Sequence, residues 1–406
     1  MGIKIEKISM TAETLRDILS AEGIEVRYNL ITHTIEIIDT YGVLNDAEKP
    51  FDTLIAYIID KYREEYKYCT KDGLVMLLGL LANNNQHNPI LERIIKYSKE
   101  INVYDDYIGE ISHNIMNIAD SDKLSHLLFR KTMEQKMALS QNDADSPFGA
   151  EAVTVLNGDQ GIGKSLFTQA SAVESKYYRT ISLNSYKLDE TDVLEKASGV
   201  FMGEIPELEK SLKPATLDFL KAFITAGKDS FRPKYGTATC DFVRRSTYIA
   251  TCNTDNFLID RTGNRRFWVI PCKNKFDIKR LALCVEGKDD IFLKAYAQAY
   301  NSLKKNGLQS FRLTDREREE VENRNSNYMC VSDCENQLIA ILKYGGVKEF
   351  TIDQLKSNYS ELAQYDNSKI GRILTSRLDI PQRIKKDNSK GKSTTQRVYH
   401  NTMGLQ

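Results

Sequence analysis

The chain has 406 residues, with 41% hydrophobic and 28% charged, which is typical of a folded globular protein and excludes a disordered or fibrous one. Lys and Arg together number 56, as do Asp and Glu, so the zero net charge excludes a uniformly basic nucleic-acid-binding surface. The length suggests two or three domains. Apolar runs stay below the roughly 18 residues that span a bilayer, and seven scattered Cys favour reduced thiols. We therefore expect a cytoplasmic protein that binds no membrane.

Residues 1–100 are expected to form a mixed α/β accessory domain. Apolar spacing predicts helices over 12–21, 51–66 and 71–82, and β-like runs lie between 25 and 38. The stretch has no carboxylate triad and no zinc-ligand spacing that would support priming activity, so its role stays open.

Residues 101–328 are expected to form an ATPase core with a leading helical subdomain. After the helical stretch 101–139, a polar loop over 140–147 precedes alternating β-like runs and helices, the pattern of a parallel α/β sheet. The charge run over 315–325 is interpreted as a solvated helix or a linker.

A phosphate-binding loop follows the apolar run 152–156. The sequence GDQGIGKS has the GxxxxGK[ST] spacing between a strand and a helix, and its key residues are Gly158, Gly161, Gly163, Lys164 and Ser165. Glycines let backbone N–H groups point at phosphate oxygens, Lys supplies a charge to the β and γ phosphates, and the Ser hydroxyl can coordinate Mg²⁺. The expected cofactors are ATP and Mg²⁺.

Further residues with suitable chemistry follow at the ends of later strands. Glu204 ends an apolar run and Glu207 follows three residues later; we favour Glu204 for the metal and Glu207 for polarising water, although the roles could be exchanged. Asn253 ends the β-branched run STYIATCN, where an amide can orient the water. Arg265 or Arg266, before the run FWVI, could reach the γ-phosphate of a neighbouring subunit.

The ordered set GDQGIGKS, VFMGEIPELE, KAFITAGKDSFRPKYG, YIATCNTDNFL and DRTGNRRFW resembles the virulence-associated protein E family, proteins of phages and phage-inducible chromosomal islands related to the superfamily-three helicases. The resemblance spans about residues 83–270. It implies an AAA+ P-loop core with sheet order 5-1-4-3-2 that assembles as a ring, by superfamily membership a hexamer. It also implies that Asn253 is the sensor and that Arg265 or Arg266 is the arginine finger. The split acidic pair departs from adjacent acids, which leaves the assignment of the two acids open.

A β-hairpin is predicted between the acids and Asn253, with the runs 229–235 and 240–245 around a small polar tip. In related ring helicases a hairpin at this place projects into the central channel. Lys234 is the best candidate for a contact to single-stranded DNA, because a phosphate contact favours a mobile point charge. Arg232 could bind DNA or serve a structural role.

Residues 329–406 are expected to form a winged helix that binds duplex DNA. Helical patterns cover 335–344, 351–359 and 367–378, and two β-like runs follow with a basic connection. A neutral protein that concentrates positive charge in this way is expected to bind nucleic acid there. The candidate residues are Arg372, Lys385, Lys386, Lys390, Lys392 and Arg397.

Together these features predict an ATP-dependent DNA helicase or replication initiator of a phage or mobile genetic element. A first alternative is an origin-binding ATPase that recruits a host helicase without unwinding DNA. A second alternative is a P-loop kinase of a small molecule, which would need an acceptor pocket and a lid.

Overall fold

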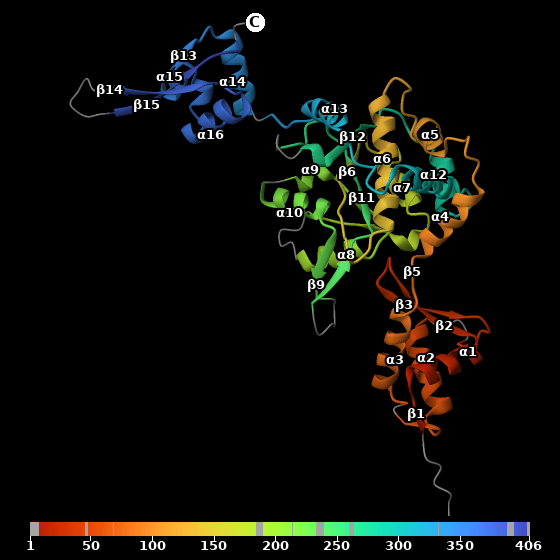
Figure 1. The fold of residues 1–406 in the computed structure, drawn as a ribbon. Helices are drawn as coiled ribbons and strands as arrows, with labels where there is room; N and C mark the ends of the chain where they lie inside the picture. Colours follow the sequence, from red (N-terminus) through yellow and green to blue (C-terminus); the bar gives the residue numbers. More distant parts are fainter. Residues whose placement is uncertain are drawn as a thin grey trace, which may run out of the picture. The chain divides into compact units, whose positions relative to one another are not determined.

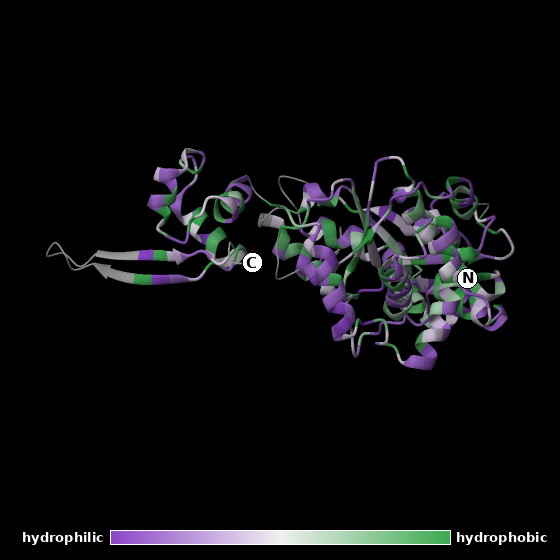
Figure 2. Ribbon diagram, turned by 90° about the horizontal axis from the view of Figure 1, so that it is seen from above, coloured by the Kyte–Doolittle hydropathy of each residue, from purple (hydrophilic) through white to green (hydrophobic). Residues whose placement is uncertain are grey.

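The computed structural model describes residues 8–44, 48–67, 69–183, 190–212, 214–232, 239–259, 264–331, 333–387 and 394–403. The chain divides into two compact units, Met1–Tyr328 and Met329–Gln406 (Figure 1). The helices are banded in purple and green in Figure 2, as expected for amphipathic helices that turn one face to a core. Among the described residues, no helix is long and apolar enough to cross a bilayer.

The N-terminal part of the first unit is a small α/β module around its own core, which includes Leu15, Leu54 and Leu74. Its main sheet has the order β3-β2-β5, with β2 antiparallel to β3 and parallel to β5. The expected helices and strands are present at nearly the expected positions: α1 Ala12–Ala21, β2 Ile24–Asn29, β3 Thr34–Asp39, α2 Pro50–Tyr62 and α3 Lys71–Asn83. Three short strands were not predicted, namely β5 Gln86–His87 and the minor pair β1 Ile8–Ser9 and β4 Tyr66–Lys67.

A set of helices then frames the central sheet. They are α4 Pro89–Glu100, α5 Tyr107–Glu110, the π-helical turn η1 Ile111–Ile115, α6 Lys123–Ser140, α11 Ile278–Val285 and α12 Ile291–Asn306. Although α4 lies before residue 100, its buried Ile90 and Ile94 belong to the large core of the first unit, where α4 packs on α12. The large core therefore begins earlier in the chain than the composition suggests.

The central sheet has five parallel strands in the order β12-β6-β11-β8-β7. Numbered along the chain, this is the order 5-1-4-3-2. The strands are β6 Val153–Asn157, β7 Tyr178–Thr180, β8 Met202–Ile205, β11 Thr247–Cys252 and β12 Phe267–Pro271. All residues of β6 and β11 are buried, which explains their continuous apolar and β-branched composition.

Shorter elements connect these strands. They are α7 Lys164–Ser171, η2 Ser175–Tyr177, α8 Glu190–Ser198, α9 Leu208–Ser211, α10 Pro214–Thr225, the antiparallel pair β9 Lys228–Phe231 and β10 Cys240–Val243, and η3 Asn264–Arg266. The α6 helix packs against β12, β6 and β11, and α7 packs against β8, β11 and β7 (Figure 1).

The charge run after α12 forms α13, Asp315–Ser326, and is not simply solvated. Val321 and Asn325 are buried, and Arg324 pairs with Asp122 while donating to the Val269 carbonyl of β12. Tertiary contacts thus hold one side of this highly charged helix against the sheet.

In its described residues the second unit contains three α-helices, two short 3-10 or π-helical turns and a three-stranded antiparallel sheet. Its elements are α14 Asp333–Tyr344, β13 Glu349–Phe350, α15 Ile352–Asn358, η4 Ser360–Leu362, α16 Asn367–Arg372 with the π-turn η5 Ile373–Arg377, β14 Gln382–Asp387 and β15 Thr394–His400. The sheet order is β13-β15-β14. A separate apolar core, with Leu338, Leu355 and Leu374 at zero or 1% exposure, holds this unit together.

Candidate active site

The loop between β6 and α7 has the backbone geometry of a phosphate cradle. Gly161 and Gly163 have φ angles of 83° and 111°, in the left-handed region where a side chain is strained. A Cβ on Gly158 would lie 2.2 Å from the Cys272 carbonyl oxygen, and one on Gly163 would lie 2.5 Å from Ile278 Cδ1. These three positions therefore require glycine, as the sequence pattern predicts.

The Lys164 side chain bridges the loop and the adjacent strand. Its Nζ donates to the carbonyl oxygens of Gly158 (2.5 Å) and Asp159 (2.7 Å) and to Asn253 Oδ1 (2.9 Å). Burial lowers the pKa of Lys164, while neighbouring groups, Asp159 and Glu209 among them, act to raise it. The structure thus brings the loop lysine and Asn253 into direct contact at the carboxyl edge of the sheet.

Glu204 is the buried acid of the site, with 2% of the residue exposed. Ser165 Oγ donates to its Oε1 at 2.7 Å, and Thr251 Oγ1 donates to the same atom at 3.2 Å. Tyr178 donates to Oε2; this bond and burial raise the pKa of the Tyr178 hydroxyl. Ser165 and Glu204, the two residues expected to hold the metal, therefore lie side by side.

The two acids that follow Glu204 have different surroundings. Glu207, at φ 48°, places its carboxylate 2.5 Å from Lys210 Nζ, and 47% of its side chain is exposed. Glu209 instead has a buried Oε2 without a hydrogen-bond partner among the described residues. It interacts electrostatically with Lys164 and helps burial to raise the pKa of the Cys252 thiol to about 11. Glu209 therefore has a covered carboxylate oxygen, whereas the carboxylate of Glu207 is paired near the surface.

Arg265 and Arg266 lie at the opposite edge of the same sheet, directly before β12. The register pairs Phe267 with Val153 at the start of β6, whereas the phosphate loop follows the end of β6. A five-residue strand spans about 16 Å, so the two arginines are not near the phosphate loop of their own chain.

These arginines line a cavity of about 340 Å³ together with Glu151, Thr225, Arg312 and Arg318. Arg318 pairs with Glu151 at 3.1 Å. Arg265 is exposed, and the buried Nε of Arg266 has no hydrogen-bond partner within the described parts of the chain. Four arginines facing one acid give this edge a strong positive charge.

The predicted hairpin corresponds to β9 and β10. Its base is held by a buried ion pair between Arg244 and Asp229, and Arg244 also donates to the Phe223 carbonyl. Arg232 is exposed just beyond β9, whereas Lys234 lies outside the described residues. The contact expected at Lys234 stays a prediction.

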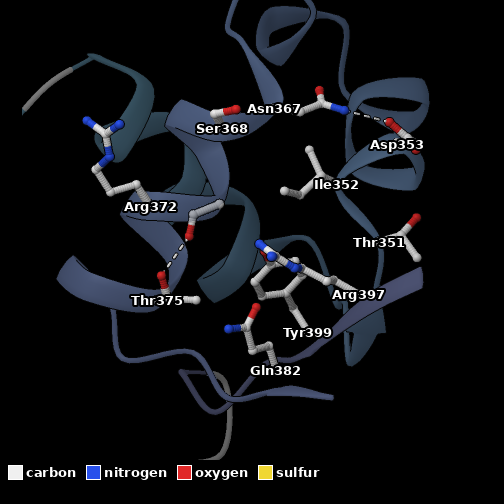
Figure 3. A pocket seen from close by; sticks show the side chains of 11 residues that line it. Thr351, Ile352, Asp353, Asn367, Ser368, Arg372, Thr375, Gln382, Arg397 and Tyr399 are labelled. Carbon is white, nitrogen blue, oxygen red and sulfur yellow. Dashed lines mark hydrogen bonds between the residues drawn. The ribbon is translucent and has the colours of Figure 1, made fainter. Parts of the chain in front are cut away.

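The second unit carries a polar cavity of about 520 Å³ between α15, α16 and the sheet (Figure 3). Arg372 and Arg397 contribute to its lining and are exposed. In Figure 3 the guanidinium of Arg397 lies near the centre of the cavity and that of Arg372 points away from it. Lys385 and Lys386 lie on β14 without described side chains, and Lys390 and Lys392 lie outside the described residues.

Several site residues were missed by sequence reasoning: Tyr178, Thr251, Glu209, Arg312 and Arg318. Thr251 could have been found, since it lies two residues before Asn253 on a β-branched strand and so points to the same side. The others come from distant segments that meet only in the folded chain, and no local pattern marks them.

Comparisons with known proteins agree with this architecture. The apo structure of the NrS-1 C-terminal region (305–718) matches with a TM-score of 0.53 at 12% identity, covering 97% of this chain and all of that one. An A-form apo structure of the same region gives 0.49 at 14% identity, with 97% and 100% coverage. No curated protein matches the chain. The virulence-associated protein E-like domain matches residues 106–330, more than half of the chain, and the chain therefore belongs to the virulence-associated protein E-like family.

Proposed function

We propose that this protein is an ATP-dependent DNA helicase or replication initiator of a phage or mobile genetic element, with an AAA+ motor that works as a ring. The observation that carries the proposal is the placement of two groups of expected site residues at opposite edges of the central sheet. Lys164, Ser165, Glu204 and Asn253 gather at the carboxyl edge, and Arg265 and Arg266 lie at the other. The strand order 5-1-4-3-2 supports the AAA+ assignment.

The residues at the carboxyl edge fit ATP and Mg²⁺. Ser165 Oγ and the Glu204 carboxylate are oxygen ligands of the kind Mg²⁺ prefers, and Lys164 would exchange its carbonyl partners for phosphate oxygens. When bound, Mg²⁺ would neutralise charge on the β and γ phosphates. Asn253 would sense the γ-phosphate, since it already contacts Lys164. Glu207 was expected to polarise water, but the buried free oxygen of Glu209 makes Glu209 the better candidate.

The position of the arginines supports assembly with a neighbouring subunit. Because Arg265 and Arg266 are at the far edge from their own phosphate loop, they can stabilise transition-state charge only in a neighbouring subunit. A kinase that acts as a monomer would not need arginines at the sheet edge opposite to its phosphate loop. The ring size, a hexamer, is taken from the resemblance to superfamily-three helicases.

DNA contacts are proposed at two places. The β9–β10 hairpin, with Arg232 and Lys234, would contact single-stranded DNA in the ring channel. The second unit has the element order of a winged helix, three helices with a β-hairpin after the third. Its Arg372 and Arg397, with the lysines of the β14–β15 segment, would contact duplex phosphates.

The test is ATP hydrolysis with and without single-stranded DNA for the wild type, Lys164→Ala and Lys196→Ala. Lys196 is an exposed lysine paired only locally with Asp192, and so it is a matched control. We expect DNA to stimulate the wild type and Lys196→Ala, and Lys164→Ala to lose at least about 100-fold in rate, as for removal of a main charge-stabilising group.

Strand displacement on a forked duplex then separates the remaining functions. Unwinding supports the helicase. DNA-stimulated hydrolysis without unwinding favours the origin-binding ATPase that recruits a host helicase. Hydrolysis that ignores DNA would contradict the proposed channel contacts and favour the kinase alternative.

A further inference from the structure

Two of the five histidines of the chain lie together with an aspartate outside the nucleotide site. His113 is on the π-turn η1, Asp120 is in the following loop, and His126 is in the first turns of α6. One ligand atom from each of the three lies within 4.8 Å of the others. Their separation along the chain, by seven and six residues, matches no common metal-binding motif, so the sequence gives no hint of this cluster.

The two imidazole rings are stacked. Their centroids are 3.9 Å apart with an interplanar angle of 26°, and His113 Nδ1 lies 2.8 Å from Asp120 Oδ1. The carboxylate pairs with only one of the two rings.

His126 has a polar neighbour at each ring nitrogen. Ser112 Oγ lies 2.8 Å from Nδ1 and 3.0 Å from the Gly109 carbonyl oxygen, to which it can donate. Nε2 lies 3.2 Å from the Ala119 carbonyl oxygen. A neutral imidazole carries one N–H. In the tautomer that donates Nδ1–H to Ser112, Nε2 keeps a lone pair with which it can bind a cation.

We propose that His113, Asp120 and His126 bind a divalent transition metal ion, with zinc as the representative ion. Imidazole nitrogen and carboxylate oxygen are ordinary zinc ligands, whereas Mg²⁺ prefers oxygen alone. Ser112, by fixing the N–H on Nδ1, orients His126 so that Nε2 faces the metal, as outer partners of metal-bound histidines do. This inference does not depend on the proposed ATPase function.

The loop that carries Asp120 is already held in place. Asn117 Nδ2 donates to the Lys275 carbonyl at 2.7 Å, and Asn274 donates back to the Asn117 carbonyl at 2.9 Å. Phe276 in turn donates its N–H to the Ile162 carbonyl of the phosphate loop. The metal would be structural, because it would join η1 and α6 beside the segment that supports the phosphate loop.

The test is zinc binding by the full chain after removal of bound metal, measured by competition with a chromophoric chelator. We expect one tight equivalent for the wild type, loss of that equivalent in the double variant His113→Ala/His126→Ala, and a decrease of about 10–100-fold in affinity for Ser112→Ala. His400→Ala, which alters a histidine of the second unit, is the matched control and should bind as the wild type does.

Two further measurements test whether the variants are folded and whether histidines or cysteines bind the metal. Circular dichroism checks that the variants are folded, and zinc should raise the Tm of the wild type but not that of the double variant. Co²⁺ should give a visible spectrum without thiolate charge-transfer bands. Equal zinc affinity in the wild type and the folded double variant, or a thiolate band, which would assign the metal to cysteines, would overturn the proposal.

Discussion

The two edges of the central sheet carry opposite kinds of chemistry. At the carboxyl edge, Lys164 and Glu204 are buried. Lys164 donates to the exposed Asn253, and Glu204 accepts from Ser165. At the amino edge, Arg265 and Arg266 line an open cavity with two further arginines and one acid. One edge gathers a lysine, an acid and an amide, and the other gathers arginines. In the proposed ring, a complete ATPase site would combine the carboxyl edge of one subunit with the amino edge of the next.

The largest expected effect is at the amino edge. Arg265→Ala should lower ATP turnover by about 1,000-fold or more while ATP binding is retained, because an arginine finger contributes that much to phosphoryl transfer. Arg266→Ala should have a smaller effect, since Arg265 is exposed while the Arg266 Nε is buried. Steady-state turnover and nucleotide binding measure the two effects, with Arg316→Ala, 88% exposed, as the control.

Mixing variants tests the division between subunits. Lys164→Ala retains the arginines and Arg265→Ala retains the phosphate loop, so a mixture of the two inactive proteins should regain part of the activity. If the mixture stays inactive while both proteins assemble, the arginines do not act on a neighbouring site.

Arg244, at the same edge of the sheet, should affect the stability of the fold rather than ATP turnover. Arg244 is 1% exposed and paired with Asp229, so Arg244→Met leaves a buried carboxylate and should lower the free energy of unfolding by about 3–5 kcal/mol. Urea unfolding followed by Trp268 fluorescence measures this, because the only Trp lies fully buried in β12. The double variant Asp229→Leu/Arg244→Met should recover much of the stability. No loss in the single variant would mean that the pair is not buried in solution.

Glu207 and Glu209, the two acids after Glu204, should contribute unequally to ATP turnover. Glu209→Gln should lower turnover by about 100-fold, the lower part of the range for a general base. Glu207→Gln should change it by only a few-fold, because its carboxylate pairs with Lys210 at the surface. Single-turnover ATP hydrolysis compares them. The reverse ranking would restore the role first expected for Glu207.

The smallest effect is expected in the second unit. Arg397→Ala should weaken duplex DNA binding several-fold and reduce the salt dependence of log K by about 0.9, the value for one phosphate contact. Fluorescence anisotropy at several salt concentrations measures both, and Lys343→Ala, exposed on α14, is the control. An unchanged salt slope for Arg397→Ala would exclude a phosphate contact at this residue.

Much of the fold was predictable because its signals are local. The phosphate loop is fixed by glycine spacing between an apolar strand and a helix, and α1, β6, β8, β11 and β12 lie close to the expected runs. The short strand β7 was not predicted individually. Capping residues such as Thr314 and Thr351 begin their helices through short-range hydrogen bonds. The charge run 315–325 was correctly expected to be helical as one of two alternatives, but its buried side was not foreseen.

By itself, the sequence determined the Lys164 and Ser165 pair, the acid Glu204 at the end of a strand and the arginines before β12, because each depends on residue type and spacing within a few positions. Only the tertiary structure decided that Glu207 pairs with Lys210 while Glu209 has a buried carboxylate oxygen. It also decided that Tyr178 and Thr251 donate to Glu204, and that His113 stacks on His126. These contacts depend on where distant segments of the chain meet and on whether a carboxylate is buried or paired at the surface. Hydrophobic periodicity along the sequence predicts neither of these two features.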